Sequence, residues 1–160
     1  ELGNKCLFAF VKTAFITERE AQEAEALAWR LGGRLVRVEL DPLDLPQVAA
    51  NDRLRCYFCK RALMTELKVL AAREGLPAVV EGSNADDQQA YRPGKKALDE
   101  LGIISPLAEC GLTKQVIREL ALALELPNWQ RPSLPCLATR FPYDTLLTPE
   151  ALAQVAEAEA

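Results

Sequence analysis

The first part of the chain alternates short apolar runs with a helical stripe of apolar residues. Cys6–Val11 is a continuous apolar run with β-branched and aromatic members, which predicts a buried strand. Thr17 and Glu20 fit a capping box, and the stripe that follows predicts a helix that ends at Gly32. Leu35–Leu40 predicts a second strand. Because short links join strand, helix and strand, we expect a βαβ unit with parallel pairing.

A second set of elements follows a turn with two prolines at Asp41–Pro46. A long helical pattern begins near Cys56 and ends at Gly75, and Ala78–Glu81 predicts a third short strand. Small and acidic residues follow it: Gly82, Ser83, Asn84, Ala85, Asp86 and Asp87. Because α/β proteins bind ligands at the carboxyl ends of parallel strands, this segment predicts a nucleotide or magnesium site. An Asx turn without a ligand is the alternative interpretation.

The rest of the chain predicts helices at Lys95–Leu101 and Thr113–Leu126, with Ser105–Leu107 as an edge strand or extended link. Five of the ten prolines lie between Pro127 and Pro149, which indicates a connection between domains. A last helix is expected to begin after Thr148, with proline in its first position. We therefore predict an α/β three-layer sandwich with a parallel sheet over residues 1–126. Residues 127–160 are predicted to form a linker and the first helix of a further domain.

Composition limits the classes of protein to which this chain can belong. Hydrophobic residues make up 49% of the 160 residues and charged residues 26%, which is typical of a globular domain. The net charge of −4 argues against a nucleic-acid partner. An apolar run of about 18 residues and an N-terminal signal are both missing, so we expect no membrane insertion and a cytoplasmic location. The lack of histidine excludes imidazole bases and histidine-bound zinc within these residues.

Cysteines supply the candidate chemistry. Cys56 and Cys59 lie three residues apart at a predicted helix start, where the helix dipole and neighbouring basic residues favour thiolates. Such a pair can be a redox couple, half of a zinc site, two ligands of an iron–sulfur cluster, or ordinary packing. Cys136 lies in a proline-rich stretch, Arg131–Tyr143, which predicts either a rigidly held reactive sulfur or a structural cysteine. If Cys136 folds back onto the pair, three thiolates converge, as in a four-iron cluster with one open iron.

Five motifs in order resemble the LarE family of ATP-dependent sulfur transferases, which mature the nickel-pincer cofactor of lactate racemase. They are NDRLRCYFCK (Asn51–Lys60), EGSNADD (Glu81–Asp87), YRPG (Tyr91–Gly94), ISPLAECGLTKQVIRELA (Ile104–Ala121) and RPSLPCLATRFPYDTLLT (Arg131–Thr148). The resemblance covers nearly the whole chain. It implies a PP-loop ATP pyrophosphatase domain, of the adenine nucleotide alpha hydrolase type, followed by a smaller C-terminal domain.

The resemblance also implies an activity. Such an enzyme uses ATP and Mg²⁺ to adenylate a carboxylate of a pyridinium mononucleotide, and then replaces AMP with sulfur. The sulfur comes either from Cys136, which becomes dehydroalanine, or by way of a 4Fe-4S cluster held by Cys56, Cys59 and Cys136. Thr139 and Arg140 match residues that approach the substrate phosphate. The nucleotide site is implied at Gly82, Ser83, Asn84, Asp86 and Asp87. We expect a small-molecule nucleotide substrate and a homo-oligomer.

Two departures from the family pattern matter. The phosphate-binding SGGxDS loop, expected before Leu2, does not occur in the chain, and the C-terminal domain is cut after its first helix. We expect a fragment of a longer protein, with Glu1–Gly3 as the end of a helix, that binds ATP weakly and is inactive alone. The competing functions are a tRNA-thiolating PP-loop enzyme and a non-catalytic iron–sulfur or metal-binding module. Cysteines that only pack in the core are the plainest alternative.

Overall fold

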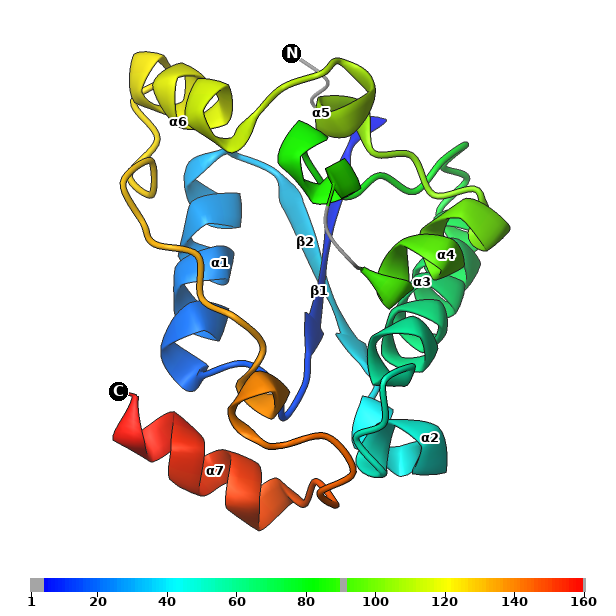
Figure 1. The fold of residues 1–160 in the computed structure, drawn as a ribbon. Helices are drawn as coiled ribbons and strands as arrows, with labels where there is room; N and C mark the ends of the chain where they lie inside the picture. Colours follow the sequence, from blue (N-terminus) through cyan, green and yellow to red (C-terminus); the bar gives the residue numbers. More distant parts are fainter. Residues whose placement is uncertain (1–4, 90–91, 160) are drawn as a thin grey trace.

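The computed structural model describes residues 5–89 and 92–159 and has mixed α/β architecture (Figure 1). Its elements are β1 (Leu7–Lys12), α1 (Glu18–Arg30), β2 (Arg34–Glu39), the 3₁₀ helix η2 (Pro42–Asp44), α2 (Pro46–Ala49), α3 (Arg55–Arg73), the 3₁₀ helix η3 (Ala85–Gln89), α4 (Pro93–Leu101), α5 (Pro106–Glu109), α6 (Lys114–Ala123), the 3₁₀ helix η4 (Leu137–Arg140) and α7 (Pro149–Ala158). The predicted helix end at Glu1–Gly3 and Tyr91 of the YRPG motif lie outside the described residues.

The predicted βαβ unit is confirmed. β1 and β2 pair in parallel, with Phe8 opposite Leu35, and α1 connects them. The capping box begins α1: the Thr17 amide donates to the Glu20 carboxylate at 2.9 Å, and the Glu20 amide donates to Oγ1 of Thr17 at 3.2 Å. Figure 1 shows α1 on one side of the two strands and α3 with α4 on the other. This arrangement is that of an α/β fold with helices on both sides of its strands.

The predicted third strand is much shorter than expected. Of Ala78–Glu81, only Val80 pairs, in an isolated parallel bridge with Ile104, and this residue is 60% exposed. The prediction of an edge strand or extended link at Ser105–Leu107 was wrong. Ser105 precedes α5 there, because Pro106 occupies the first position of a helix, where its fixed φ is favourable. The hydrogen-bonded sheet of the described residues is therefore two-stranded.

The main hydrophobic core joins the beginning and the end of the chain. It consists of Phe15, Val48, Leu137, Ala138, Leu147 and Leu152. Main-chain hydrogen bonds reinforce it, from the Leu137 amide to the Phe15 carbonyl at 3.0 Å and from the Leu147 amide to the Ala49 carbonyl at 2.8 Å. Full burial of a leucine contributes about 1.5–3 kcal/mol to folding. The core therefore holds η4, and Cys136 just before it, against the rest of the molecule.

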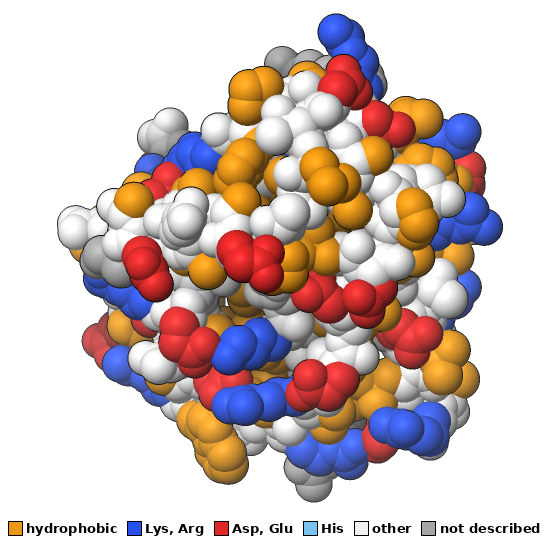
Figure 2. Space-filling view, turned by 90° about the horizontal axis from the view of Figure 1, so that it is seen from below, with side chains coloured by type: hydrophobic (Ala, Val, Ile, Leu, Met, Phe, Trp, Pro, Cys, Tyr) orange, Lys and Arg blue, Asp and Glu red, His pale blue; other side chains and the backbone are white. Residues whose placement is uncertain are grey.

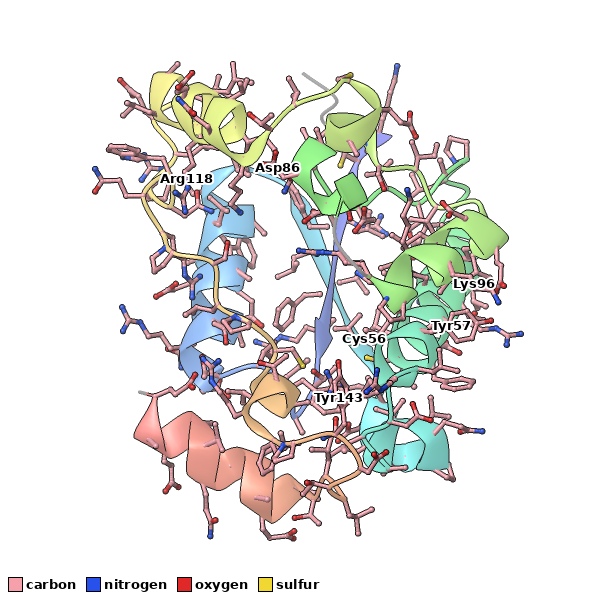
Figure 3. All side chains as sticks on the ribbon, viewed as in Figure 1. Cys56, Tyr57, Asp86, Lys96, Arg118 and Tyr143 are labelled. Carbon is pink, nitrogen blue, oxygen red and sulfur yellow. The ribbon has the colours of Figure 1, made fainter. Side chains whose placement is uncertain are left out.

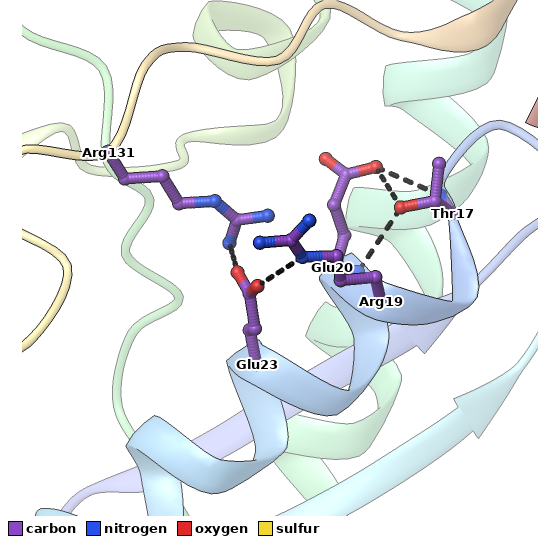
Figure 4. Close-up of polar contacts among 5 residues, drawn as sticks. All are labelled: Thr17, Arg19, Glu20, Glu23 and Arg131. Carbon is purple, nitrogen blue, oxygen red and sulfur yellow. Dashed lines mark hydrogen bonds and ion pairs between the residues drawn. The ribbon is translucent and has the colours of Figure 1, made fainter. Parts of the chain in front are cut away.

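An ion pair fixes the segment that leads into η4. Arg131 contacts the Glu23 carboxylate of α1 at 2.5 Å, and Arg19 donates to the same carboxylate at 2.9 Å (Figure 4).

Seen from below, acidic, basic and apolar side chains are interleaved on the surface (Figure 2). No helix in the described part of the chain has the length and apolar character needed to cross a membrane.

Helix α6 begins at its predicted cap, Thr113, and ends at Ala123, three residues before the predicted end. The apolar side chains of this helix are not buried among the described residues. No residue of α6 is buried, and Leu120 and Leu124 are exposed. An amphipathic pattern predicts a helix but does not say whether another part of the chain covers its apolar face.

Candidate active site

A cavity of about 680 Å³ brings together segments that are far apart in the sequence. It is bounded by the first turns of α3 and α4, the residues around η3, and η4 with the residue before it. Six of the predicted site residues line it: Cys56, Ser83, Asn84, Asp87, Cys136 and Thr139. Four others do not: Cys59, Gly82, Asp86 and Arg140. The cavity therefore joins one cysteine of the CxxC pair, the Cys136 loop and part of the predicted nucleotide segment.

The three predicted thiols are neighbours. Cys56 points from the first turn of α3 toward the centre of the molecule, while Tyr57 lies on the outer side of the helix (Figure 3). Burial raises the pKa of the Cys59 thiol to about 12, and the adjacent Cys136 and Cys56 add to the effect. Burial also raises the pKa of Cys136, although its side chain is exposed at the cavity wall, and Arg55 acts in the opposite direction. Both shifts favour the protonated thiol, whereas a bound metal would favour the thiolate.

The donor set suits a soft metal centre. Within residues 5–89 and 92–159, no three Cys, Asp or Glu side chains are placed to share a single metal ion. Thiolates on a four-iron cluster lie farther apart than those around one ion, because each binds a different iron. Three neighbouring thiols on two elements, with no histidine in the chain, match such a cluster in number and softness. They do not match a hard cation such as Mg²⁺.

The Gly82–Asp87 segment forms an Asx turn beside the cavity. The Asn84 side chain accepts a hydrogen bond from the Asp86 amide at 2.9 Å, and the Asp87 carboxylate accepts one from the Asn84 amide at 3.1 Å. Asp87 also pairs with Arg92 at 2.7 Å. Gly82 has open space where a Cβ would be, so no close backbone contact within the chain requires glycine there. The turn is thus present, and Ser83, Asn84 and Asp87 also face the cavity.

Thr139 and Arg140 point to different places. The Thr139 hydroxyl donates to the Cys136 carbonyl at 2.7 Å, which stabilises the turn that carries the thiol. The Arg140 guanidinium instead forms an ion pair with Glu159 at the end of α7. The structure therefore brings Thr139 to the cavity and directs Arg140 away from it.

Several cavity residues were missed as site residues in the sequence. The largest omission is Arg55, which is buried and donates to the Ala138 carbonyl at 3.2 Å. Lys60 and Tyr143 also line the cavity. The sequence feature that could have pointed to Arg55 is its position directly before the CxxC pair, four residues after Asn51.

Known proteins provide an independent comparison. No protein-family model matches the chain. It is 37% identical over 158 residues to an uncharacterised Synechocystis protein, covering 99% of the chain and 59% of that protein. It is 36% identical over 159 residues to a pyridinium-3,5-bisthiocarboxylic acid mononucleotide synthase of Lactiplantibacillus plantarum, covering 99% of the chain and 58% of the synthase. The chain belongs to the LarE-type family.

A third relative comes from an archaeon. An uncharacterised protein of Methanocaldococcus jannaschii is 30% identical over 155 residues, which cover 96% of the chain and 58% of that protein. The chain thus spans 58–59% of the length of these curated relatives. The family assignment concerns the region that aligns, which contains all the predicted site residues.

Proposed function

We propose that the full-length protein is an ATP-dependent sulfur transferase that acts on a carboxylate of a pyridinium mononucleotide in nickel-pincer cofactor biosynthesis. One observation carries the proposal: Cys56 and Cys136 share a cavity with Asn84 and Asp87 of the candidate nucleotide segment. The relation to a pyridinium-3,5-bisthiocarboxylic acid mononucleotide synthase supports the substrate class. The parallel pairs β1–β2 and Val80–Ile104 support a complete three-layer sandwich in the whole protein.

The proposed reaction has two steps. First, a carboxylate oxygen of the substrate attacks the α-phosphorus of ATP, and pyrophosphate leaves with the electrons of the broken P–O bond. Ser83, Asn84 and Asp87 are the proposed nucleotide contacts, with the Asp87 carboxylate as a ligand for Mg²⁺. Second, a sulfur nucleophile attacks the acyl carbon, and AMP leaves. The net change replaces one carboxylate oxygen with sulfur.

The cysteines provide the sulfur in one of two ways. A 4Fe-4S cluster on Cys56, Cys59 and Cys136 would supply one iron with an open coordination position for an external sulfur donor. In the alternative, the Cys136 sulfur attacks the acyl carbon as AMP leaves; a base then takes the Cα proton of Cys136, the Cβ–Sγ bond breaks with its electrons remaining on sulfur, and dehydroalanine remains. We favour the cluster, because Cys56 and Cys59 have no role in the alternative, yet both lie beside Cys136.

Mass spectrometry of the reaction tests the proposal. Full-length protein, prepared anaerobically, is incubated with ATP, Mg²⁺, sulfide and the biscarboxylic acid mononucleotide. We expect AMP and a product in which sulfur replaces oxygen, and we expect both to be lost without ATP. Cys136→Ala should abolish the sulfur product. Cys110→Ala should retain it, because Cys110 is an exposed cysteine that does not line the cavity. If wild-type protein forms neither AMP nor thiocarboxylate, the proposed function is wrong.

A further inference from the structure

Arg55 is the one buried residue with a charged side chain in the part of the chain that the structure describes, with 5% of its surface exposed. Charged residues are almost never fully buried unless they are paired. None of the ion pairs among the described residues includes Arg55. Its guanidinium donates instead to the Asn51 side-chain oxygen, to the Ala138 carbonyl at 3.2 Å and to the Cys56 sulfur at 3.5 Å.

These partners lie on the two elements that carry the thiols. Cys56 is in the first turn of α3 and Asn51 lies in the turn just before that helix, whereas Ala138 is in η4, two residues after Cys136. Asn51 is fully buried, and its side-chain amide donates to the Pro142 carbonyl at 2.8 Å. Arg55 and Asn51 therefore hold η4 at two points, Ala138 within it and Pro142 just beyond its end.

Stability alone does not explain a buried guanidinium at this position. Removing such a cation from water costs free energy, and an apolar side chain of similar volume is often as stabilising. What arginine offers is a planar fork of five donors that can bond several acceptors at fixed angles. Lysine has a point charge on a flexible stem and cannot reproduce that geometry.

We infer that Arg55 is a positioning residue of the sulfur site, which fixes the Cys136 loop against the first turn of α3 so that the Cys56 and Cys136 sulfurs face the same cavity. The inference rests on the proposed function for the use made of the two sulfurs. Their relative placement is a property of the protein without substrate, and so it can be measured separately.

Cross-linking measures that placement. Reduced, metal-free full-length protein without ATP or substrate is treated with a bifunctional alkylating reagent of short span, and peptide mapping quantifies the Cys56–Cys136 product. We expect rapid cross-linking in the wild type. In Arg55→Met and Arg55→Lys we expect a roughly tenfold slower reaction, which corresponds to about 1.4 kcal/mol. Each cross-linking rate is divided by the rate at which a monofunctional reagent alkylates Cys136 in the same variant, because Arg55 lowers the pKa of that thiol and its loss reduces the reactive thiolate.

Arg61→Met is the matched control, because Arg61 is an exposed arginine on the same helix and does not line the cavity. We expect wild-type cross-linking in this variant. Thermal unfolding identifies the variants that are folded at the temperature of the assay. If Arg55→Met does not fold, Arg55→Lys serves in its place, because it retains the charge and most of the side-chain volume. A purely structural role would lower the unfolding temperature but leave cross-linking of the folded protein unchanged.

Two results would overturn the inference: no Cys56–Cys136 product in the wild type, or wild-type rates in the folded Arg55 variants. Failure of the proposed function looks different. If cross-linking depends on Arg55 but the wild type transfers no sulfur, the positioning role stands and the assigned reaction is wrong.

Discussion

Glu81 is the most constrained carboxylate next to the cavity. It accepts hydrogen bonds from the Ser105 hydroxyl at 2.6 Å and the Ser83 amide at 2.9 Å, and Lys60 lies 3.8 Å away. Burial acts to raise its pKa, but the hydrogen bonds from Ser105 and Ser83 outweigh this effect and hold the pKa below the ordinary value of 4.5. Glu81 thus connects α3, the loop before η3 and the start of α5.

Replacing Glu81 by glutamine should therefore destabilise the protein in a pH-dependent manner. A carboxyl group with a lowered pKa stabilises the folded state above its unfolded pKa, and this contribution is lost as pH falls through the folded pKa. We expect the free energy of unfolding to drop by about 1.5 kcal/mol in Glu81→Gln at pH 7, with a smaller difference below pH 4.5. Urea unfolding across this range measures it. Glu66→Gln, at an exposed position of α3, is the control. A difference that does not vary with pH would contradict this account.

At the residue scale, the sequence identified the thiols better than the groups that hold them. A cluster on the three cysteines requires the Cys136 loop to fold back onto the CxxC pair, and Cys56 and Cys136 both line the cavity. Arg55 was interpreted only as a nearby positive charge, because a sequence does not reveal which charged residue is buried. Its contact with Ala138 links residues 83 positions apart.

The helices illustrate what local chemistry can predict. Thr17, Thr113 and Thr148 stand at the starts of predicted helices, and each accepts a hydrogen bond from the amide three residues later. The predictions for extended segments were less accurate: Ala78–Glu81 forms a single bridge, and a helix begins within Ser105–Leu107. Strand pairing depends on neighbours that are distant in sequence, whereas a cap depends on a few adjacent residues.

The N-caps of the last two α-helices, α6 and α7, should contribute unequally to the free energy of unfolding. Thr148 begins α7, which buries Leu152 in the main core, whereas Thr113 begins α6, which has no buried residue. We expect Thr148→Ala to reduce the free energy of unfolding by about 1 kcal/mol and Thr113→Ala by less. Fraying of α6 exposes little additional apolar surface. Chemical denaturation of both variants measures the difference. An equal or larger loss of stability in Thr113→Ala would contradict the weak packing of α6.

The contact between α3 and α4 depends on Gly94. A Cβ on this buried residue would lie 3.3 Å from the Cys56 carbonyl oxygen, a backbone atom that cannot easily move. We expect Gly94→Ala to destabilise the protein by about 1–3 kcal/mol, because α4 must shift away from the Cys56 turn. Gly82→Ala is the control, since nothing lies within 4 Å of the added methyl group. Thermal unfolding compares them. Equal effects of the two substitutions would contradict the predicted close packing.

At the scale of the whole molecule, the α/β class and the parallel βαβ unit followed from the alternation of apolar runs and helical stripes. The packing of the C-terminal segment against the rest of the chain did not follow from these patterns. Leu137, Leu147 and Leu152 lie in a segment interpreted as a linker and the start of a further domain, yet they share one core with Phe15 and Val48. That shared core brings Cys136 back to the CxxC turn. The association of distant apolar residues is a tertiary property that no local pattern encodes.

The central claim is that Cys56, Cys59 and Cys136 act as one unit in sulfur transfer, and iron analysis tests it most directly. Anaerobically prepared full-length protein should hold about four irons and show the broad visible absorption of a 4Fe-4S cluster. Serine at any one of the three positions should remove most of the iron, because two thiolates hold a cluster poorly, whereas Cys110→Ser should retain it.

The sacrificial mechanism gives a different result in the same preparations. Wild-type protein would then contain little iron and would lose about 34 Da after one turnover, because the Cys136 sulfur passes to the substrate, two hydrogens are lost and dehydroalanine remains. Mass spectrometry before and after a single turnover detects this loss. The account predicts about four irons, lost in each of the three serine variants, and no change in protein mass. An iron-free wild type that loses this mass, or three serine variants that keep both iron and activity, would contradict it.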